Sequence, residues 1–342
     1  MDDKGQKPRV SVIIPAYNAQ DTIGTCLAAL EHQTVSRPSY EIIVVDDGSR
    51  DHTCDQVEKF QGVRLFRQEN AGPSVARNLG IAQARGEILL FTDDDCEPTG
   101  DWIERMQAPF QDIEIVGVKG TYLTRQPGLV PRFVQLEFED KYDRMAMDKY
   151  IDFVDTYSAG YCRSVLVANN GFDPTFPVAS TEDQELSFRL ARQGCKMVFA
   201  PQAKVYHLHH PRNIGEYWRK KFNIGYWKVV VHRTHPDKLV RDSHTPQILK
   251  LQILLLAAAG LFAIAGFFWL PLWWISGLMG FTFLLSTLPF TLKAWSKDPR
   301  AALISPGLLF IRALALGTGF ASGLFFNLRT GEELEKKEKL SG

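Results

Sequence analysis

The side chains best suited to chemistry are three consecutive aspartates, Asp93, Asp94 and Asp95, which follow an apolar run from Ile88 to Phe91. Such a run is typical of a buried strand in a parallel sheet, and ligands of open parallel sheets bind at the carboxyl ends of the strands. In an extended segment Asp93 and Asp95 point to the same side. Together they could hold one hard cation, which could neutralise a diphosphate. The alternative is that the acids stabilise the first turn of a helix, although one acid would suit that role better than three.

A second pair of acids, Glu182 and Asp183, opens a segment whose apolar residues have helical spacing. Thr181 could cap this helix, and Gly194 is a plausible stop. By itself the pair could be no more than acids that stabilise the first turn of the helix. Three histidines follow the next predicted strand, at positions 207, 209 and 210.

The elements that must position these side chains alternate between strand and helix patterns. The predicted strands cover 10–15, 41–45, 63–66 and 88–91, and the predicted helices cover 21–33, 53–60 and 76–84. This alternation predicts a parallel, doubly wound α/β sheet with its polar strand ends at one edge. Because neither a GxGxxG nor a Walker fingerprint follows any strand, the sequence disfavours a dinucleotide enzyme and a P-loop ATPase.

The composition excludes some partners and sites. The 342 residues include 39 Lys+Arg and 39 Asp+Glu, so the overall charge favours no nucleic acid as a partner. Five scattered cysteines lack paired spacing, which disfavours a zinc site and a disulfide framework and suits a cytosolic location. The polar N-terminus is not a secretory signal.

The last hundred residues predict a membrane region over 246–328. Two helices are predicted at about 249–270 and 272–292. Residues 251–270 and 272–292 are uncharged and long enough to span a bilayer, with Trp269, Trp273 and Trp274 at their turn. The short loop that follows is basic, at Lys293, Lys297 and Arg300, which places that side in the cytoplasm. A third apolar segment, 301–326, contains Arg312 and is expected either to span or to be re-entrant. Residues 329–342 form a charged tail.

Between the two regions lies a basic, aromatic segment, 211–245. Ile214, Trp218, Phe222 and Tyr226 recur every four residues, and basic residues lie off that line. This pattern predicts an amphipathic helix at a membrane surface. The alternative is an ordinary helix packed on the protein.

Residues 8–210 resemble the family 2 glycosyltransferases of the GT-A fold. The motifs that carry the resemblance are Val10–Tyr17, Val44–Ser49, Asn70–Asn78, Asp93–Asp95 and Thr181–Gln184. A looser similarity connects His207 and the membrane helices to bacterial transferases of the succinoglycan exopolysaccharide type. The resemblance implies a Rossmann-like, mostly parallel domain over residues 1–210, followed by an α-helical membrane region.

The resemblance also implies roles for individual residues. Asp183 matches the general base, with Glu182 and Gly160 on the acceptor side. Asp93, Asp95 and His207 match the ligands of Mg²⁺ or Mn²⁺, although His209 and His210 leave the choice of histidine open. The positions implied to hold the nucleotide sugar are Pro15, Tyr17, Asp47, Arg77, Asp93 and Asp94.

The implied activity is inverting transfer of one sugar from a nucleotide-diphosphate sugar to a membrane-associated acceptor in bacterial polysaccharide or glycan biosynthesis. The acceptor is expected to be linked to polyprenyl diphosphate. The Gln-X-X-Arg-Trp signature of processive synthases is absent. One alternative is a polyprenyl-phosphate glycosyltransferase that charges the lipid carrier itself. Another is a catalytically inactive binding protein anchored in the membrane. The expected location is the inner membrane, as a multi-pass protein with its catalytic domain in the cytoplasm.

Overall fold

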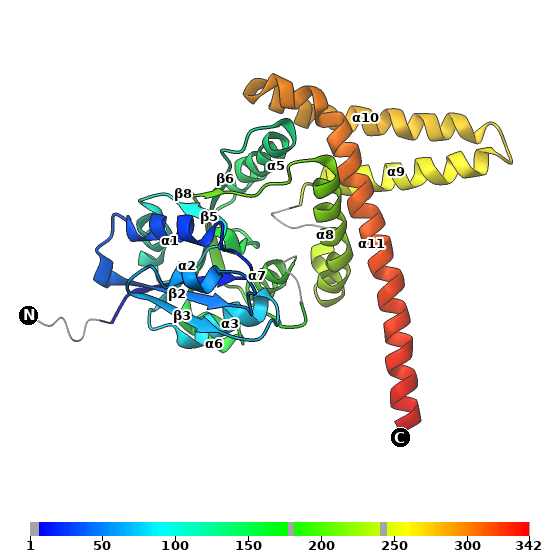
Figure 1. The fold of residues 1–342 in the computed structure, drawn as a ribbon. Helices are drawn as coiled ribbons and strands as arrows, with labels where there is room; N and C mark the ends of the chain where they lie inside the picture. The colour runs from blue at the N-terminus through cyan, green and yellow to red at the C-terminus, as the bar shows by residue number, and fades with distance from the viewer. Residues whose placement is uncertain (1–6, 177–180, 240–244, 342) are drawn as a thin grey trace, which may run out of the picture. The chain divides into compact units, whose positions relative to one another are not determined.

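The computed structural model describes residues 7–176, 181–239 and 245–341, and these fall into two compact units. One unit contains the described residues up to Gln126 together with Lys141–His210. The other contains Pro127–Asp140 and the described residues from Pro211 onward. Residues 127–140, which were expected in the first domain, therefore belong with the helical second unit. Figure 1 shows the elements of both units.

The first unit is built on one eight-stranded sheet in the order β3-β2-β1-β4-β7-β6-β8-β5. Its first four strands pair in parallel, as the alternating pattern predicts. The residues of β1, β2 and β4 are almost all buried, because these apolar runs form the middle of the sheet. The four strands are β1 (Val10–Ala16), β2 (Tyr40–Asp46), β3 (Val63–Arg67) and β4 (Ile88–Phe91), and the connecting helices are α1 (Ile23–Glu31), α2 (Thr53–Val57) and α3 (Pro73–Gln83).

The other half of the sheet is mixed. β7 (Ala159–Cys162) runs antiparallel to both β4 and β6 (Ile115–Leu123), and β5 (Cys96–Pro98) runs antiparallel to β8 (Lys196–His207). β6 and β8 are parallel, so the sheet remains mostly parallel. The remaining helices of this half are α4 (Trp102–Gln107), α6 (Arg163–Ala168) and α7 (Glu182–Arg192).

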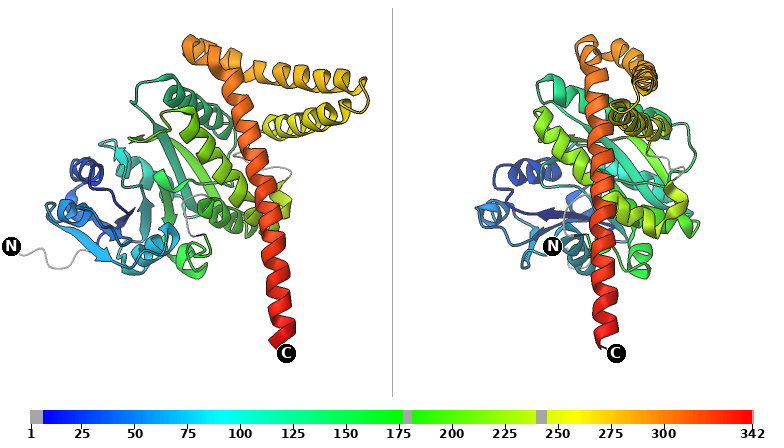
Figure 2. Two further views of the ribbon diagram at one scale, coloured as in Figure 1. Left: turned by 45° about the vertical axis from the view of Figure 1, so that its right-hand side comes forward. Right: turned by 90° about the vertical axis from the view of Figure 1, so that its right-hand side faces the viewer.

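The second unit is helical. It contains α8 (Ile214–Thr234), α9 (Gln247–Gly266), α10 (Leu272–Lys297), α11 (Pro299–Ser341) and the first part of α5 (Leu129–Met145). Three of its helices are long and apolar enough to cross a membrane: α9, α10 and residues Pro299–Phe326 of α11. Figure 2 shows α9 and α10 side by side as a hairpin that runs across α11.

Helix α8 occupies most of the segment expected at the membrane surface, whose residues 240–244 lie outside the described part. Within the second unit it packs along α11. Its most buried residues are Tyr217, Gly225, Val229 and Val231, which do not lie on the predicted line, and Ile214 of that line is exposed. The face of α8 that contains these buried residues therefore fits the alternative interpretation, a helix packed on the protein.

Gly120 of β6 provides a test of the packing in the mixed half of the sheet. A Cβ atom there would lie 2.0 Å from Ser158 Oγ and 2.5 Å from the carbonyl oxygen of Ala203. We expect Gly120→Ala to destabilise the first unit by about 1–3 kcal/mol, because the backbone must move. In thermal unfolding of the full chain in detergent, Tm should fall by roughly 2–10 °C.

Gly24 of α1 is the matched control, since a Cβ atom there would meet nothing within 4 Å. Gly24→Ala should leave Tm unchanged or raise it, because alanine favours a helix by up to about 1 kcal/mol over glycine. Equal Tm values for the two variants would contradict the close approach at Gly120.

Candidate active site

The register of the parallel strands brings the predicted site residues to one edge of the sheet. Ala16 at the end of β1 pairs with Asp46 at the end of β2, and Ile13 pairs with Phe91 at the end of β4. The aspartate triplet therefore follows a strand that lies beside β1. The loops after all three strands meet there, as expected for the carboxyl edge of an open sheet.

The three aspartates have different surroundings. Asp94 Oδ2 accepts a hydrogen bond from the backbone N–H of Tyr17 at 3.2 Å, so Asp94 holds the loop after β1. Ligand atoms of Asp93, Asp95 and Cys96 lie within 4.8 Å of one another. Burial and the charges of Asp95 and Asp93 raise the pKa of Asp94 to about 8, and burial also raises the pKa of Asp93.

His207 is the histidine closest to this group. Its Nε2 lies 3.0 Å from Asp95 Oδ2, and its side chain is buried. His209 is half exposed, with Nδ1 3.8 Å from the same oxygen, whereas His210 Nδ1 faces His207 Nδ1 at 3.1 Å. Burial raises the pKa of the Cys96 thiol well above its usual range, which keeps Cys96 protonated and a poor ligand.

These surroundings fit a hard divalent cation. The carboxylates of Asp93 and Asp95 supply the oxygen ligands that Mg²⁺ and Mn²⁺ prefer, and the imidazole of His207 adds a nitrogen. Burial raises the pKa values of Asp93 and Asp94, and repulsion from the neighbouring aspartates adds to the rise. A bound cation would relieve that repulsion.

Arg77 of α3 connects the triplet to the second acidic motif. Its Nη1 donates to Glu182 Oε1 at 2.7 Å, and its Nη2 lies 3.3 Å from Asp93 Oδ1. The guanidinium is buried and also lies over the ring of Phe172, 5.5 Å from its centroid. The sequence places Arg77 near the nucleotide, whereas the structure makes it the bridge between the two carboxylate groups.

Asp183 lies in the first turn of α7, beside that bridge. Its Oδ1 accepts a hydrogen bond from the N–H of Gln184 at 2.7 Å. Burial, reinforced by the charge of Glu182, raises the pKa of Asp183 to about 7. Such a carboxyl can accept a proton near neutral pH. Thr181 occupies the N-cap position but makes no side-chain capping bond, so that prediction is wrong.

On the side expected to bind the nucleotide, Asp47 is buried and holds a loop. Its carboxylate accepts hydrogen bonds from Gln68 Nε2 at 2.7 Å and from the N–H groups of Ala71 and Gly72 at 2.9 Å. Tyr17 is 47% exposed, and Pro15 is part of β1, where it pairs with Val45. The structure therefore brings Tyr17 and the loop held by Asp47 to the edge where the triplet lies.

Gly160, expected on the acceptor side, lies in the core. It pairs with Leu90 of β4 and Val118 of β6. A Cβ atom at this position would lie 2.9 Å from Leu90 Cδ2 and 3.3 Å from both Met106 and Phe110. The prediction for Gly160 is not supported, because its free face points into the packing beneath α4.

The structure also reveals a buried polar cluster that the sequence analysis missed. Lys119 of β6 contacts Asp155, and its Nζ donates to Tyr157 Oη at 3.1 Å. Tyr157 Oη donates to Asp155 at 2.9 Å and pairs with Tyr142 Oη at 2.8 Å. Burial lowers the pKa of Lys119 to about 7, and the charge of Asp183 opposes this shift. A lysine within the apolar strand pattern at 115–123 is the signal that could have indicated this cluster.

Comparisons with known proteins agree with this geometry. The model of glycosyl transferase family 2 matches residues 11–168. Glycosyltransferase AglE of Haloferax volcanii is 29% identical over 235 residues, which cover 66% of this chain and 74% of that protein. The putative glycosyltransferase EpsH of Bacillus subtilis is 28% identical over 242 residues, or 64% of this chain and 67% of that protein.

A solved structure shows the same fold. Mannosyltransferase PcManGT from Pyrobaculum calidifontis, in complex with GDP-Man and Mn²⁺, superposes with a TM-score of 0.62 at 17% identity. The superposition covers 93% of this chain and 88% of that one. The strand order, the carboxylate-rich edge, the family model and these relatives lead to one conclusion: this chain is a glycosyltransferase whose residues 11–168 form a family 2 domain with the GT-A fold.

Proposed function

We propose that this glycosyltransferase moves one sugar, with inversion, from a nucleotide-diphosphate sugar to a membrane-associated, lipid-linked acceptor. The observation that carries the proposal is the bridge made by Arg77. It contacts Asp93 of the triplet and Glu182, the neighbour of Asp183. The buried guanidinium of Arg77 thus connects the aspartate triplet, which is suited to bind a diphosphate through a metal ion, to the first turn of α7, which contains the proposed base. Both reactants of a sugar transfer can therefore be held by one rigid cluster.

In the proposed reaction, the carboxylate of Asp183 accepts the proton of the acceptor hydroxyl. The hydroxyl oxygen forms a bond to the anomeric carbon, while the bond from that carbon to the diphosphate breaks. The nucleoside diphosphate leaves with the electron pair, and the proton remains on Asp183. Arg77 keeps Glu182, and with it the first turn of α7, beside Asp93.

Asp93, Asp95 and His207 would hold Mg²⁺ or Mn²⁺, which when bound supplies positive charge for the leaving diphosphate. PcManGT was solved with Mn²⁺ and GDP-Man, which supports the same class of cofactor and donor here. Tyr17 and the loop 68–72, which Asp47 holds in place, are positioned to contact the nucleotide.

A membrane-bound acceptor is supported by the second unit. Helices α9 and α10 are apolar enough to span, and only 17% and 11% of their most apolar stretches are buried. The junction that follows is basic, with Lys293 and Lys297 at the end of α10 and Arg300 at the start of α11. By the positive-inside rule, this junction lies on the cytoplasmic side of a bacterial inner membrane. Nucleotide sugars are available to the catalytic domain on that side.

Asp183→Asn tests the general base. The amide keeps the size of the side chain but cannot accept the proton, and general-base catalysis is typically worth about 10²–10⁴-fold. We expect kcat to fall at least about a hundredfold while donor affinity stays near that of the unmodified enzyme. Steady-state transfer kinetics and calorimetric titration with the nucleotide sugar measure the two quantities.

Asp148→Asn, which removes a charge from an exposed site of the same unit, is the control and should leave both quantities unchanged. If Asp183→Asn keeps most of its rate, the base is another residue. If it loses donor binding, Asp183 belongs to the nucleotide side.

Asp95→Asn tests the cation site. Replacing one oxygen ligand with an amide should weaken Mn²⁺-dependent binding of a nucleoside diphosphate by at least about tenfold, since even indirect partners of a metal typically contribute 10–100-fold. Thermal-shift titrations with UDP, GDP and dTDP, each with and without Mn²⁺, measure this.

Glu97→Gln is the control, because Glu97 lies two residues further on and pairs with Arg125 at the surface. It should leave the Mn²⁺ dependence intact. Unchanged Mn²⁺-dependent affinity in Asp95→Asn would remove Asp95 from the cation site.

The pH dependence of kcat/KM provides a further test. Because Asp183 must be a carboxylate and its pKa is about 7, activity should fall as the pH drops through about 7, by tenfold per unit below it. Glu182→Gln removes the neighbouring negative charge and frees Arg77 from it. Both changes favour ionised Asp183, so the acid limb should move to lower pH.

Glu185→Gln is the control, because Glu185 lies on the same helix but pairs with Arg189. It should leave the position of the limb unchanged. A limb that moves equally in both variants, or in neither, would show that Asp183 does not control it.

A further inference from the structure

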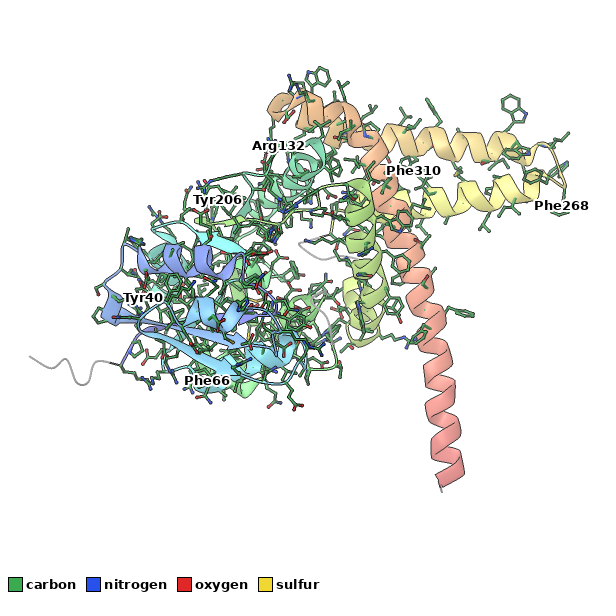
Figure 3. The ribbon with its side chains drawn as sticks, viewed as in Figure 1. Tyr40, Phe66, Arg132, Tyr206, Phe268 and Phe310 are labelled. Carbon is green, nitrogen blue, oxygen red and sulfur yellow. The ribbon has the colours of Figure 1, made fainter. Side chains whose placement is uncertain are left out.

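The third apolar helix differs from the other two in its surroundings. In the most apolar stretch of Pro299–Phe326, 44% is buried inside the protein, against 17% for α9 and 11% for α10. Figure 3 shows Phe268 at the far end of the α9–α10 hairpin and Phe310 on α11. The hairpin thus extends away from the other helices of the second unit, whereas α11 remains in contact with them.

A buried ionic cluster surrounds the arginine of this helix. Arg312 is 7% exposed, and its Nη1 donates to Glu137 Oε1 of α5 at 3.0 Å. Its Nη2 donates to Gln252 Oε1 of α9 at 3.1 Å. The other carboxylate oxygen of Glu137 is 3.0 Å from Lys221 Nζ and 3.1 Å from Tyr217 Oη, both of α8. The charge of Arg312 is therefore neutralised by Glu137, a residue of α5.

The first half of α11 packs along that helix. Leu308 and Leu309 join a core with Phe133 and Val134 of α5, and Ala301 and Ala302 pack on Leu136. Where α10 ends and α11 begins, α5 forms three ion pairs with them: Lys293–Asp140 at 2.8 Å, Lys297–Glu139 at 3.0 Å and Arg132–Asp298 at 3.3 Å.

The second half of α11 packs along α8 through backbone contacts at glycines. A Cβ atom at Gly319 would lie 2.2 Å from the carbonyl oxygen of Phe222, and one at Gly323 would lie 2.5 Å from that of Tyr226. A Cβ atom at Gly225 of α8 would lie 2.3 Å from the carbonyl oxygen of Leu316. Such close approach fixes the two helices to one another.

If α11 crossed the bilayer, α5 and α8 would have to enter the hydrocarbon core with it. Helix α8 carries exposed Arg219 and Lys220. The ion pairs of α5 with the end of α10 and with Asp298 involve polar groups that are only partly buried. Charged groups are costly to place in the bilayer core. Moreover, α5 continues directly into the catalytic domain through Lys141, so it lies on that domain's side of the membrane.

We propose that Pro299–Phe326 does not cross the membrane but lies along its surface with α8, on the side of the catalytic domain, so that only the α9–α10 hairpin spans. The lipid bilayer contacts its exposed face. Leu303, Phe310, Leu314 and Phe325 form an exposed stripe along one side of α11. The stripe begins five residues after Asp298, where the hairpin returns to the surface. An apolar stripe beside basic residues is suited to the lipid headgroup region.

The location of the C-terminus tests this topology. We would express the full chain in a bacterial host with alkaline phosphatase or green fluorescent protein fused after Gly342. We expect fluorescent protein to be active and phosphatase inactive, since the C-terminus should lie on the cytoplasmic side with the catalytic domain. An active phosphatase at the C-terminus would show that α11 crosses, and would overturn the proposal.

Reporters inserted after Leu270, in the turn of the hairpin, are the control. Phosphatase should be active there whether or not α11 crosses. If it is inactive, the hairpin does not span, and the proposal fails together with the membrane anchor; the sugar-transfer assays of Asp183→Asn do not depend on this result.

The depth of the exposed stripe tests the lipid contact directly. Spin labels would be attached to Leu303→Cys, Phe310→Cys, Leu314→Cys and Phe325→Cys in the full chain in lipid vesicles, with the signal of the unsubstituted protein subtracted. Positions 303 and 325 are about 33 Å apart along a helix. Equal, shallow depths at all four positions are expected for a surface helix, whereas a label near the bilayer centre flanked by shallow ones would show a crossing.

Discussion

The active site depends on one buried positive charge, the guanidinium of Arg77. Arg77 is removed from water, and a guanidinium in that position is tolerated only with carboxylates around it. It finds them on two elements that are far apart in the chain, at Asp93 after β4 and at Glu182 at the start of α7. The next residue of α3, Asn78, exchanges two hydrogen bonds with the backbone of Phe172, at 2.7 and 2.8 Å. Helix α3 thus fixes the sheet edge that carries Asp93–Asp95 relative to Phe172 and Glu182.

The bridge also organises the charges of the site. On one side, burial raises the pKa values of Asp93 and Asp94 and the neighbouring carboxylates add to the rise, which favours a divalent cation. On the other side, burial and Glu182 raise the pKa of Asp183 to about 7, which suits a base at neutral pH. Lys119, paired with Asp155, adds a second buried cation whose charge opposes the shift at Asp183. The site therefore combines a group of three aspartates, in contact with Arg77, and a buried carboxyl at Asp183.

The second unit uses the same principle for a different purpose. Arg312 would be costly in lipid, but Glu137 and Gln252 surround it within the protein. Glycines at positions 225, 319 and 323 let α8 and α11 approach closely, so apolar length alone does not make α11 a spanning helix. The sequence left open whether the third apolar segment spans or is re-entrant, and its packing distinguishes it from the hairpin.

The sequence by itself determined the alternating α/β pattern, the family 2 motifs, the acidic strand end at Asp93–Asp95 and the apolar hairpin, because each depends on residues close together in the chain. Only the tertiary structure decided which histidine lies nearest Asp95, that Gly160 belongs to the core and that β7 and β5 run antiparallel. It also decided that Arg77 contacts both Asp93 and Glu182, which is 105 positions away from Arg77 in the sequence, and that Lys119 is buried with Asp155. These features depend on contacts between distant segments, and a local pattern does not encode which charged groups will share one buried volume.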